Sequence, residues 1–392
     1  MTKFCYVDLF AGIGGFAISM NERGGKMVSF SEIDKTAIQY YCKNHKVSQE
    51  YNLGDICQLD KIPYHDILTA GVSCQPWSIA GKKRGFDDPR GRLWDDTLRV
   101  LEENKPKCFV FENVRGLTGN KDALNYILNK ISEIGYYHYN VVLDSSDFGV
   151  LQKRERLYII GFLEKRFYDK FEIPEPTNIE NCIGEEFGIE LSGCGIDYFI
   201  FNDLRNGENT IHSWDIKETT ERQKEICQIL LQNRRKKKFG DKDGNPLTLS
   251  DFKSLDKTIR KNELDELVDL SIFKNKYGRY EFKNSKMSSG VDGIYRIIMP
   301  SAKYYPTLVA SDTRDFIATR DIESKEQFII EIYQKGNYRK ITKEEACVIQ
   351  GFPPDFELPE KRNKWMKLLG NSVAIPVIDK IIDSIIKTKV FG

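Results

Sequence analysis

The most constraining feature of this sequence is an alternation of strand-like and helix-like segments over residues 3–162. Short runs rich in β-branched and aromatic residues are typical of strands, and apolar residues three and four apart are typical of helices. The strand-like runs are KFCYVDLF, KMVSFSEID, HDILTAG, KCFVFEN and RLYIIGF, and the helix-like runs are FAISMNER and KTAIQYYCKNH. This order predicts an α/β fold with a mainly parallel sheet, in which ligands bind at the carboxyl ends of strands.

The pattern changes in the middle of the chain. Two prolines in FEIPEPTN, residues 171–178, mark a boundary, and residues 181–335 mix glycines, lysines, asparagines and aromatics without a clear period. Order returns in TKEEACVIQGF, which predicts a helix with a capping box from Thr342 to Glu345 and an end at Gly351. The tail AIPVIDKIIDSIIKTK predicts an amphipathic helix. We therefore expect an α/β domain over 1–180, a smaller irregular domain over 181–335, and a return to the first domain over 336–392.

Composition excludes several classes of protein. A chain of 392 residues with 40% hydrophobic and 30% charged residues is long enough for two globular domains. Its apolar runs are too short to cross a bilayer and no signal sequence precedes them, so we expect an intracellular protein without a membrane partner. The nine cysteines form no CxxC pair and only four histidines occur, which argues against a disulfide framework and a metal site.

A net charge of +1 neither favours nor excludes nucleic acid, because binding requires a basic face and not a basic total. One basic run, Arg234 to Lys238, has two interpretations: a solvated loop, or a set of phosphate contacts.

A glycine-rich loop, DLFAGIGG, follows the first predicted strand. Gly12, Gly14 and Gly15 allow a tight turn and a close approach to a ligand, but their spacing is GxGG and not the GxGxxG of dinucleotide sites. Glu32, 20 residues after Gly12, ends the second strand, where an acid can accept hydrogen bonds from ribose. Asp55 follows as a candidate acceptor for an adenine amino group. Each feature alone has an ordinary structural explanation; together they favour a nucleoside-containing cofactor.

Cys74 lies in GVSCQPWS, after the strand-like run HDILTAG. An isolated cysteine is usually a small buried hydrophobe. Three features favour a nucleophile instead: the position at a strand's end, small neighbours, and the charged, glycine-rich stretch GKKRGFDDPRGRLW, which resembles a lid. The small neighbours are Gly71, Ser73, Ser78 and Gly81.

Glu112 and two arginines complete the candidate set. Glu112 ends the strand-like run KCFVFEN, where it is either a solvated cap or an acid beside the cysteine loop. Arg154 and Arg156 in QKRERLY are two residues apart, so an extended chain presents them on one face. They are either part of a surface edge or a pair of donors for an anion or a carbonyl.

The motifs and their order resemble the DNA (cytosine-5) methyltransferases of bacterial restriction–modification systems. The segments that carry the resemblance are DLFAGIGGF, SEID, GDI, SCQPWS, ENV, QKRER, Arg339 through ITKEEACVIQGFP, and GNSVAIPV. The resemblance covers residues 4–162 and 338–388, and the insert matches only in position, where the family carries its target recognition domain. The stretch KYYPTLVASDTRD resembles the family's junction at the end of that domain.

The resemblance implies a Rossmann-like sheet with helices on both faces and S-adenosylmethionine as the cofactor. Phe10 would lie against the adenine, the three glycines around the methionine portion, and Glu32 and Ile33 at the ribose. Asp55 and Ile56 would flank the adenine. The remaining implied contacts come from Leu93 and from Asn371, Ser372 and Val373 in GNSV.

The resemblance also implies the chemistry. Cys74 as a thiolate attacks carbon 6 of a flipped cytosine, Glu112 donates a proton at N3, and Arg156 stabilises the charge at O2 with Arg154 in support. Ser78 belongs to the lid. The implied partners are double-stranded DNA and a cognate restriction endonuclease, and the implied location is the bacterial cytoplasm, in association with the nucleoid.

Three alternatives remain open at this point. A nucleotide-dependent oxidoreductase on a Rossmann sheet would leave SCQPWS, ENV and GNSV unexplained. A transfer RNA cytosine-5 methyltransferase has the same architecture, although a large insert favours duplex DNA. A non-catalytic DNA-binding relative would not need Cys74, Glu112 and QKRER intact.

Ser73 departs from the family pattern, which has proline immediately before the cysteine. Proline would stiffen the loop and remove a backbone donor. Because the surrounding motifs are intact, we expect Ser73→Pro to leave the methylation rate within about tenfold, or ~1.4 kcal/mol in the barrier. Single-turnover methylation assays measure this, and a complete loss would show that the loop is built differently from the family's.

Overall fold

The computed structural model describes most of the chain. The described residues are 2–59, 62–72, 93–177, 182–191, 198–200, 210–242, 244–283 and 291–392, without the side chains of 199 and 200. Cys74, Ser73, Ser78 and the expected lid lie outside the described residues.

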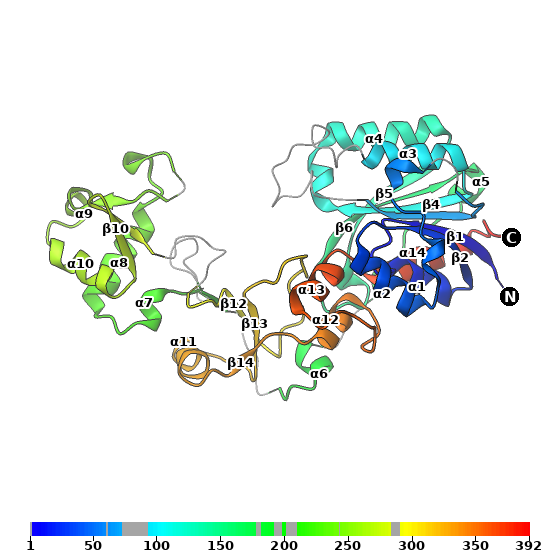
Figure 1. Ribbon diagram of the computed structural model, residues 1–392. Coiled ribbons are helices and arrows are strands. Elements are labelled where there is room, and N and C mark those ends of the chain that lie inside the picture. Colours follow the sequence, from blue (N-terminus) through cyan, green and yellow to red (C-terminus); the bar gives the residue numbers. More distant parts are fainter. Residues whose placement is uncertain are drawn as a thin grey trace. The chain divides into compact units, whose positions relative to one another are not determined.

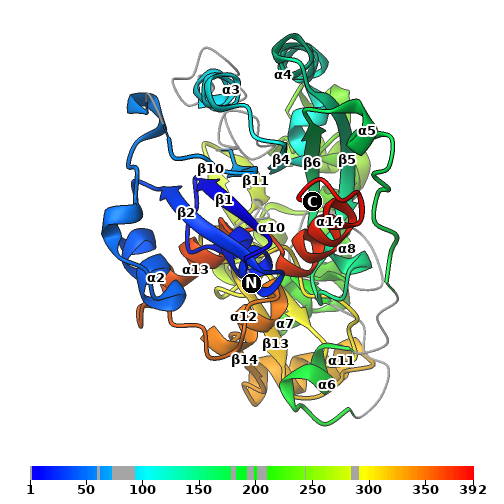
Figure 2. The ribbon, with the colours of Figure 1, turned by 90° about the vertical axis from the view of Figure 1, so that its right-hand side faces the viewer.

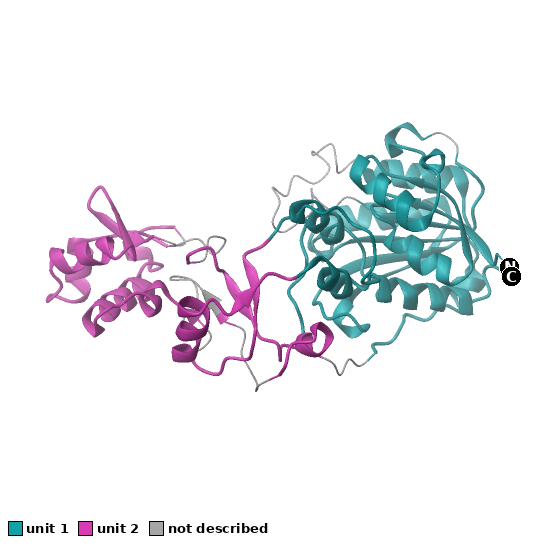
Figure 3. Cartoon of the chain, turned by 60° about the horizontal axis from the view of Figure 1, so that its bottom comes forward, with its two compact units in different colours: residues 1–180, 304–312, 342–392 teal, residues 181–303, 313–341 magenta. Residues whose placement is uncertain are grey.

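The chain divides into two compact units, shown in different colours in Figure 3. Unit 1 contains residues 1–180, 304–312 and 342–392, and unit 2 contains residues 181–303 and 313–341. The sequence predicted a single return to the first domain near residue 336. The structure adds an earlier and shorter return at residues 304–312, inside KYYPTLVASDTRD.

Unit 1 is built on a six-stranded sheet in the order β2-β1-β3-β4-β6-β5. Its strands are β1 (Phe4–Leu9), β2 (Gly25–Ser31), β3 (Ile67–Gly71), β4 (Cys108–Val114), β5 (Tyr137–Asp144) and β6 (Glu155–Phe162). β2, β1, β3 and β4 pair in parallel, and β6 lies antiparallel between β4 and β5. Figure 2 shows β4, β6 and β5 side by side. The predicted mainly parallel sheet is confirmed.

Helices cover both faces of this sheet, as predicted (Figure 1). The helices of unit 1 are α1 (Gly15–Glu22), α2 (Lys35–His45), α3 (Leu93–Asn104), α4 (Lys121–Ile134), α5 (Lys165–Tyr168), α12 (Lys343–Gln350), α13 (Arg362–Gly370) and α14 (Ile375–Lys387). α1, α2 and α14 pack with Phe4 and Tyr6 in one apolar cluster, whereas α3 and α4 pack with Val7 and Leu9 in the other. Adjacent strand positions point to opposite faces, so a strand buried on both sides is apolar throughout. None of the helices in the described residues is both long and apolar enough to span a membrane.

The C-terminal helices join the sheet as the sequence predicted. Thr342 caps α12 in a reciprocal capping box with Glu345, and Gly351 ends the helix at φ 84°. The apolar face of α14 packs on α1, and Arg23 pairs with Asp379 and Asp383 of α14 at 2.7 Å each. This combination of apolar burial and ion pairing anchors the end of the chain to its beginning.

Unit 2 contains more regular structure than the sequence led us to expect. Its helices are α6 (Ile183–Phe187), α7 (Ser213–Ile216), α8 (Glu221–Asn233), α9 (Leu249–Leu255), α10 (Lys261–Asp269) and α11 (Lys325–Phe328). Its strands are β7 (Tyr198–Ile200), β8 (Thr210–Ile211), β9 (Leu247–Thr248), β10 (Phe273–Lys276), β11 (Arg279–Phe282), β12 (Arg296–Ile298), β13 (Asp315–Ala318) and β14 (Tyr338–Arg339). They form a five-stranded sheet, β14-β13-β12-β7-β8, and a three-stranded sheet, β10-β11-β9. Strands of two to four residues are too short to show a period in sequence.

Candidate active site

The sheet order places the carboxyl ends of β1 and β3 side by side. The chain runs from β1 to β2 on one side and then crosses β1 to form β3 on the other. In open α/β sheets, ligands bind outside the carboxyl ends of the strands at such a reversal. The glycine loop follows β1, and the segment that contains Cys74 follows β3.

The glycines of the first loop have two different tasks. Gly12 has φ 56°, and a Cβ built there would meet no described atom within 4 Å, so its backbone stays accessible to a ligand. Gly14, at φ 90°, lies against His45, whose Nε2 would be 2.0 Å from such a Cβ. Gly15 lies against the C-terminal return, where a Cβ would be 2.7 Å from Val373 Cγ2. Gly14 and Gly15 therefore allow close packing, and Gly12 leaves space.

Glu32 ties the end of β2 to this loop. Its Oε2 accepts from the Gly12 backbone N–H at 2.8 Å, and its Oε1 accepts from the backbone N–H groups of Ile33 and Asp34, also at 2.8 Å. A carboxylate has about four acceptor positions, so one remains for a ribose hydroxyl. Ile33 is exposed beside it.

The apolar candidates for an adenine site belong to one cluster. Ile56 is buried in the cluster on the α3 and α4 face, and Phe10 and Leu93 are partly buried against the same cluster. Asp55 precedes Ile56 and caps a short helical turn by accepting from the Cys57 backbone N–H at 3.0 Å. Asp55 is thus next in the chain to a cluster that contains the three apolar residues, Phe10, Ile56 and Leu93.

The segment Asn371–Val373, which we call the return strap, connects α13 to α14. Asn371 is exposed, whereas Ser372 and Val373 are buried and face Gly15. An adenosine with a methionine tail fits four features of this region. They are the open backbone at Gly12, a free acceptor position on Glu32, an apolar cluster with Asp55 beside it, and the return strap.

Asp8 is a functional candidate that the sequence interpretation missed. It is fully buried in β1, and Thr69 Oγ1 donates to its Oδ1 at 2.7 Å. Its Oδ2 has no hydrogen-bond partner among the described residues. Burial, together with the nearby charge of Glu32, raises the pKa of Asp8 to about 7, although the hydrogen bond from Thr69 lowers it. An acid inside an apolar run, VDLF, is the signal that could have identified it.

Glu112 lies near the end of β4, beside the last described residue before the cysteine loop. Its backbone carbonyl accepts from the Val72 N–H at 3.2 Å, two residues before Cys74. Its side chain is largely buried, and burial raises the pKa of the Glu112 carboxyl, although the charges of Arg156 and Arg154 lower it. A carboxyl with a raised pKa keeps its proton at a higher pH than an ordinary glutamate does.

Arg156 pairs with this acid. Its Nε lies 3.0 Å from Glu112 Oε1, and both side chains are mostly buried. β4 and β6 pair with Val114 opposite Arg156, which brings the two side chains to the same end of the sheet. The pair presents an acid and a guanidinium at the carboxyl end of β4.

Arg154 makes contacts that the sequence did not predict. Its guanidinium is buried and donates to three backbone carbonyls: Leu308 at 2.9 Å, Gly370 at 3.0 Å and Ser372 at 2.8 Å. Side chains two residues apart point to the same face only in an extended strand, and Arg154 precedes β6, which begins at Glu155. Arg154 therefore anchors the return strap, and Arg156 pairs with Glu112.

Two glutamines that the sequence interpretation missed complete this anchor. Gln152 Nε2 donates to Gln350 Oε1 at 2.7 Å, and Gln152 Oε1 accepts from the Leu308 N–H at 2.7 Å. Gln350 Nε2 donates to the Ser372 carbonyl at 2.8 Å, the same oxygen that Arg154 binds. Both glutamines are fully buried. The anchor joins the segment just before β6, residues 304–312, α12 and the return strap.

We expect Arg154→Lys to lower the free energy of unfolding by about 1.5–3 kcal/mol, because an ammonium cannot reproduce the planar fork that reaches three carbonyls. Urea unfolding measures this. The matched control is Arg115→Lys, since Arg115 forms an exposed pair with Glu155 that contributes ~0–1 kcal/mol. Equal losses in both variants would contradict the anchoring role.

The comparisons with known proteins agree with this site. The sequence profile of the family described as C-5 cytosine-specific DNA methylase matches residues 4–387. The Type II methyltransferase M.HgiBI of Herpetosiphon aurantiacus is 41% identical over 417 residues, which cover 96% of this chain and 95% of the relative. M.BanI of Aneurinibacillus aneurinilyticus, also a Type II methyltransferase, is 32% identical over 99% of this chain and 97% of its own.

Solved structures give the same fold. The Entamoeba histolytica methyltransferase EhMeth superposes with a TM-score of 0.58 at 17% identity, over 99% of both chains. A putative DNA modification methyltransferase encoded within an Escherichia coli prophage gives 0.55 at 20% identity, over 98% of this chain and 99% of its own. At these identities the likeness concerns the fold alone.

The family match excludes the oxidoreductase alternative. Because the family is described as DNA methylases, methylation of RNA is less supported than methylation of DNA. This chain belongs to the C-5 cytosine-specific DNA methylases: it is an enzyme that transfers a methyl group from S-adenosylmethionine to carbon 5 of cytosine in DNA.

Proposed function

We propose that this enzyme methylates one cytosine within a short sequence of double-stranded DNA, with Cys74 as nucleophile and Glu112 and Arg156 as the groups that receive the charge. The observation that supports these roles best is the buried Glu112–Arg156 pair at 3.0 Å. It lies beside Val72, two residues before Cys74 in the chain. A buried acid with a raised pKa beside a cation is typical of a catalytic site.

The proposed reaction balances as follows. The Cys74 thiolate forms a bond to carbon 6 of cytosine, and the ring electrons move toward carbon 5 and N3. Glu112 gives its proton to N3, and Arg156 stabilises the negative charge at O2. Carbon 5 would then form a bond to the methyl group as the bond from that methyl to the sulfonium sulfur breaks, with the electron pair left on the sulfur of a neutral thioether. Carbon 5 loses its proton to a base, the bond to Cys74 breaks, and the proton at N3 returns to Glu112. The target base must leave the duplex stack before Cys74 can reach it.

S-adenosylmethionine supplies an electrophilic methyl group on its sulfonium when it is bound. In our proposal, the Glu32 carboxylate accepts from the ribose, Asp55 accepts from the adenine amino group, and Phe10, Ile56 and Leu93 cover the adenine. Gly12 gives the methionine tail access to the backbone. The return strap, held by Arg154, closes this part of the site.

We assign the reading of the DNA sequence to unit 2. Its basic run supports this assignment, because the side chains from Arg235 to Lys238 are exposed on a loop that folds around Asn245. Asn245 Nδ2 donates to the carbonyls of Arg234 and Gly240 at 3.1 and 3.0 Å, so the loop has a defined shape. Arg234 itself is buried against Phe282 and is not part of this exposed set.

We also propose that the enzyme is the modification partner of a Type II restriction system, as its relatives are named. A cognate endonuclease would then cut the same sequence when it is unmethylated. The substrate would be the host chromosome, which places the enzyme on the nucleoid in the cytoplasm.

We expect Cys74→Ser to abolish methylation while DNA binding stays within about threefold, because a hydroxyl is a far weaker nucleophile than a thiolate at neutral pH. Bisulfite sequencing of a host that lacks cytosine methylation measures activity and also reveals the recognition sequence. The control is Cys57→Ser, at an exposed cysteine of unit 1, which should stay active. Substantial turnover by Cys74→Ser would remove Cys74 from the mechanism.

We expect Glu112→Gln to lower kcat by about 10²–10⁴, because an amide cannot give a proton to N3. The protonated acid is the active form. Because burial raises the pKa of Glu112, kcat of the wild type should fall only as the pH rises through that raised value. The variant should lose this alkaline fall in the pH profile of kcat. Glu155→Gln, on the neighbouring strand β6 and half-exposed, is the control.

A further inference from the structure

The part of unit 2 from α8 to β11 has the connectivity of a small DNA-binding fold. Its order is helix α8, short strand β9, helices α9 and α10, and the hairpin β10–β11, with β11 in the middle of the sheet. Residues from all these elements share one apolar cluster. α9 and α10 with the turn 256–260 between them form a helix–turn–helix, and the hairpin takes the place of the wing in a winged helix. A fold does not by itself establish a function, so the surfaces of these elements must decide.

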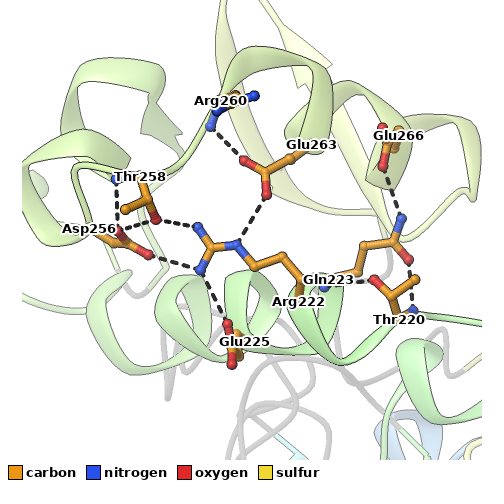
Figure 4. A network of polar contacts seen from close by, with 9 residues as sticks. All are labelled: Thr220, Arg222, Gln223, Glu225, Asp256, Thr258, Arg260, Glu263 and Glu266. Atoms are coloured by element: carbon orange, nitrogen blue, oxygen red, sulfur yellow. Dashed lines mark hydrogen bonds and ion pairs between the residues drawn. The ribbon is translucent and has the colours of Figure 1, made fainter.

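The helix–turn–helix face is closed by an ion-pair cluster centred on Arg222 of α8 (Figure 4). Its guanidinium contacts Glu263 Oε1 at 3.1 Å, Asp256 Oδ2 at 3.0 Å and Thr258 Oγ1 at 2.7 Å. In DNA-reading helix–turn–helix proteins, the N-terminal residues of the second helix contact base edges. Here Glu263, in the first turn of α10, contacts α8 instead.

The rest of α10 carries the wrong charge for a groove. Asp265 contacts Tyr280 at 2.8 Å and Lys261 at 3.2 Å, and Glu266 contacts Gln223 at 3.2 Å. Asp269 is exposed at the end of the helix. Three carboxylates along one short helix repel a phosphate backbone, so this helix is unsuited to lie in a groove of DNA.

The hairpin β10–β11, in contrast to α10, exposes basic side chains. Its inward side chains, Phe273, Tyr280 and Phe282, are buried, whereas Lys274, Lys276 and Arg279 are exposed. Lys276 lies opposite Arg279 in the register, next to the turn. Neither has a carboxylate within 4.0 Å among the residues that the structure describes. The tip therefore carries unneutralised positive charge.

The turn of the hairpin presents an aromatic ring. Tyr277 is 93% exposed, with φ 55°, and Gly278 follows with φ 75°. Two consecutive positive φ angles match the type I′ turn, in which asparagine, aspartate or glycine is the usual first central residue. Asn275 Oδ1 accepts from the Gly278 N–H at 3.0 Å and fixes the turn. A tyrosine held exposed in a conformation that suits other residues points to a role outside folding.

We propose that this hairpin tip, residues 274–279, contacts double-stranded DNA, with Lys276 and Arg279 at phosphates and Tyr277 in a groove, while the helix–turn–helix face stays away from it. The major groove accepts a two-stranded β-ribbon, and the charge of the tip complements the phosphates on both sides. The proposal rests on the assignment of DNA reading to unit 2.

The test uses the full-length protein and a pool of 30-base-pair duplexes of random sequence, with binding followed by fluorescence anisotropy over a salt series. The double variant Lys276→Ala/Arg279→Ala should bind about tenfold more weakly. It should also lower the slope of log K against log salt by about two, since each lost phosphate contact contributes ~0.9. An unchanged slope overturns the proposal.

The matched control is Lys253→Ala/Lys257→Ala. These two lysines are exposed and lie in α9 and in the turn before α10. Their substitution removes the same charge from the same unit as the hairpin variant does. Their removal should leave the slope unchanged. If the control lowers the slope and the hairpin variant does not, the helix–turn–helix face contacts DNA and the proposal fails.

Tyr277→Gly separates binding from folding. Glycine suits φ 55°, so the variant should unfold at the same or a higher temperature and yet bind DNA at least about threefold more weakly. Unchanged affinity would remove Tyr277 from the contact. Bisulfite sequencing of the wild type separates failure of the proposed function from failure of the hairpin contact. If the wild type does not methylate DNA, the proposed function fails. If the wild type methylates DNA but the hairpin variants bind DNA normally, only the hairpin contact fails.

Discussion

The structure of unit 1 depends on one buried guanidinium. Arg154 binds the carbonyls of Leu308, Gly370 and Ser372, three residues that come from two separate returns of the chain. A buried charge is costly unless it is hydrogen-bonded, and a planar fork with several donors is suited to gather carbonyls from different segments. Without Arg154, the return strap would keep the hydrogen bond from Gln350 to the Ser372 carbonyl and its packing against Gly15.

The segment that contains Arg154 and Arg156 contacts both the return strap and the acid Glu112. Arg154 and Arg156 are two residues apart: the first holds the strap that packs on Gly15, and the second pairs with Glu112. The charges of both lower the pKa of Glu112, but burial outweighs them and the pKa remains raised. In the mechanism that we propose, one short segment thus positions the cofactor pocket and tunes the acid.

Unit 2 divides its charges between two surfaces. Several acids of the α9–α10 region pair with Arg222 or lie along α10, while the hairpin tip carries the exposed basic residues Lys276 and Arg279. A fold that resembles a DNA reader would therefore use its hairpin and not its second helix. The distinction comes from ion pairs between elements, and connectivity alone would have suggested the reverse.

The sequence by itself determined the strands of the main sheet except β5, the two-faced cover of helices, the cap and end of α12, and the family. Each depends on local periodicity or on short motifs whose order is visible in one dimension. The sequence could not locate Gln152 and Gln350, since a glutamine without a neighbouring pattern gives no signal. It also could not find the strands of unit 2, which are too short to show alternation.

Only the tertiary structure decided how the two arginines differ. Spacing placed Arg154 and Arg156 together, but the partners of Arg154 lie 154 to 218 residues away. The same holds for the glycines: the motif predicted three equivalent positions, and packing against His45 and Val373 left Gly12 alone open. Local sequence specifies backbone conformation, whereas the choice of a hydrogen-bond partner or a neighbouring surface depends on segments that meet only when the chain has folded.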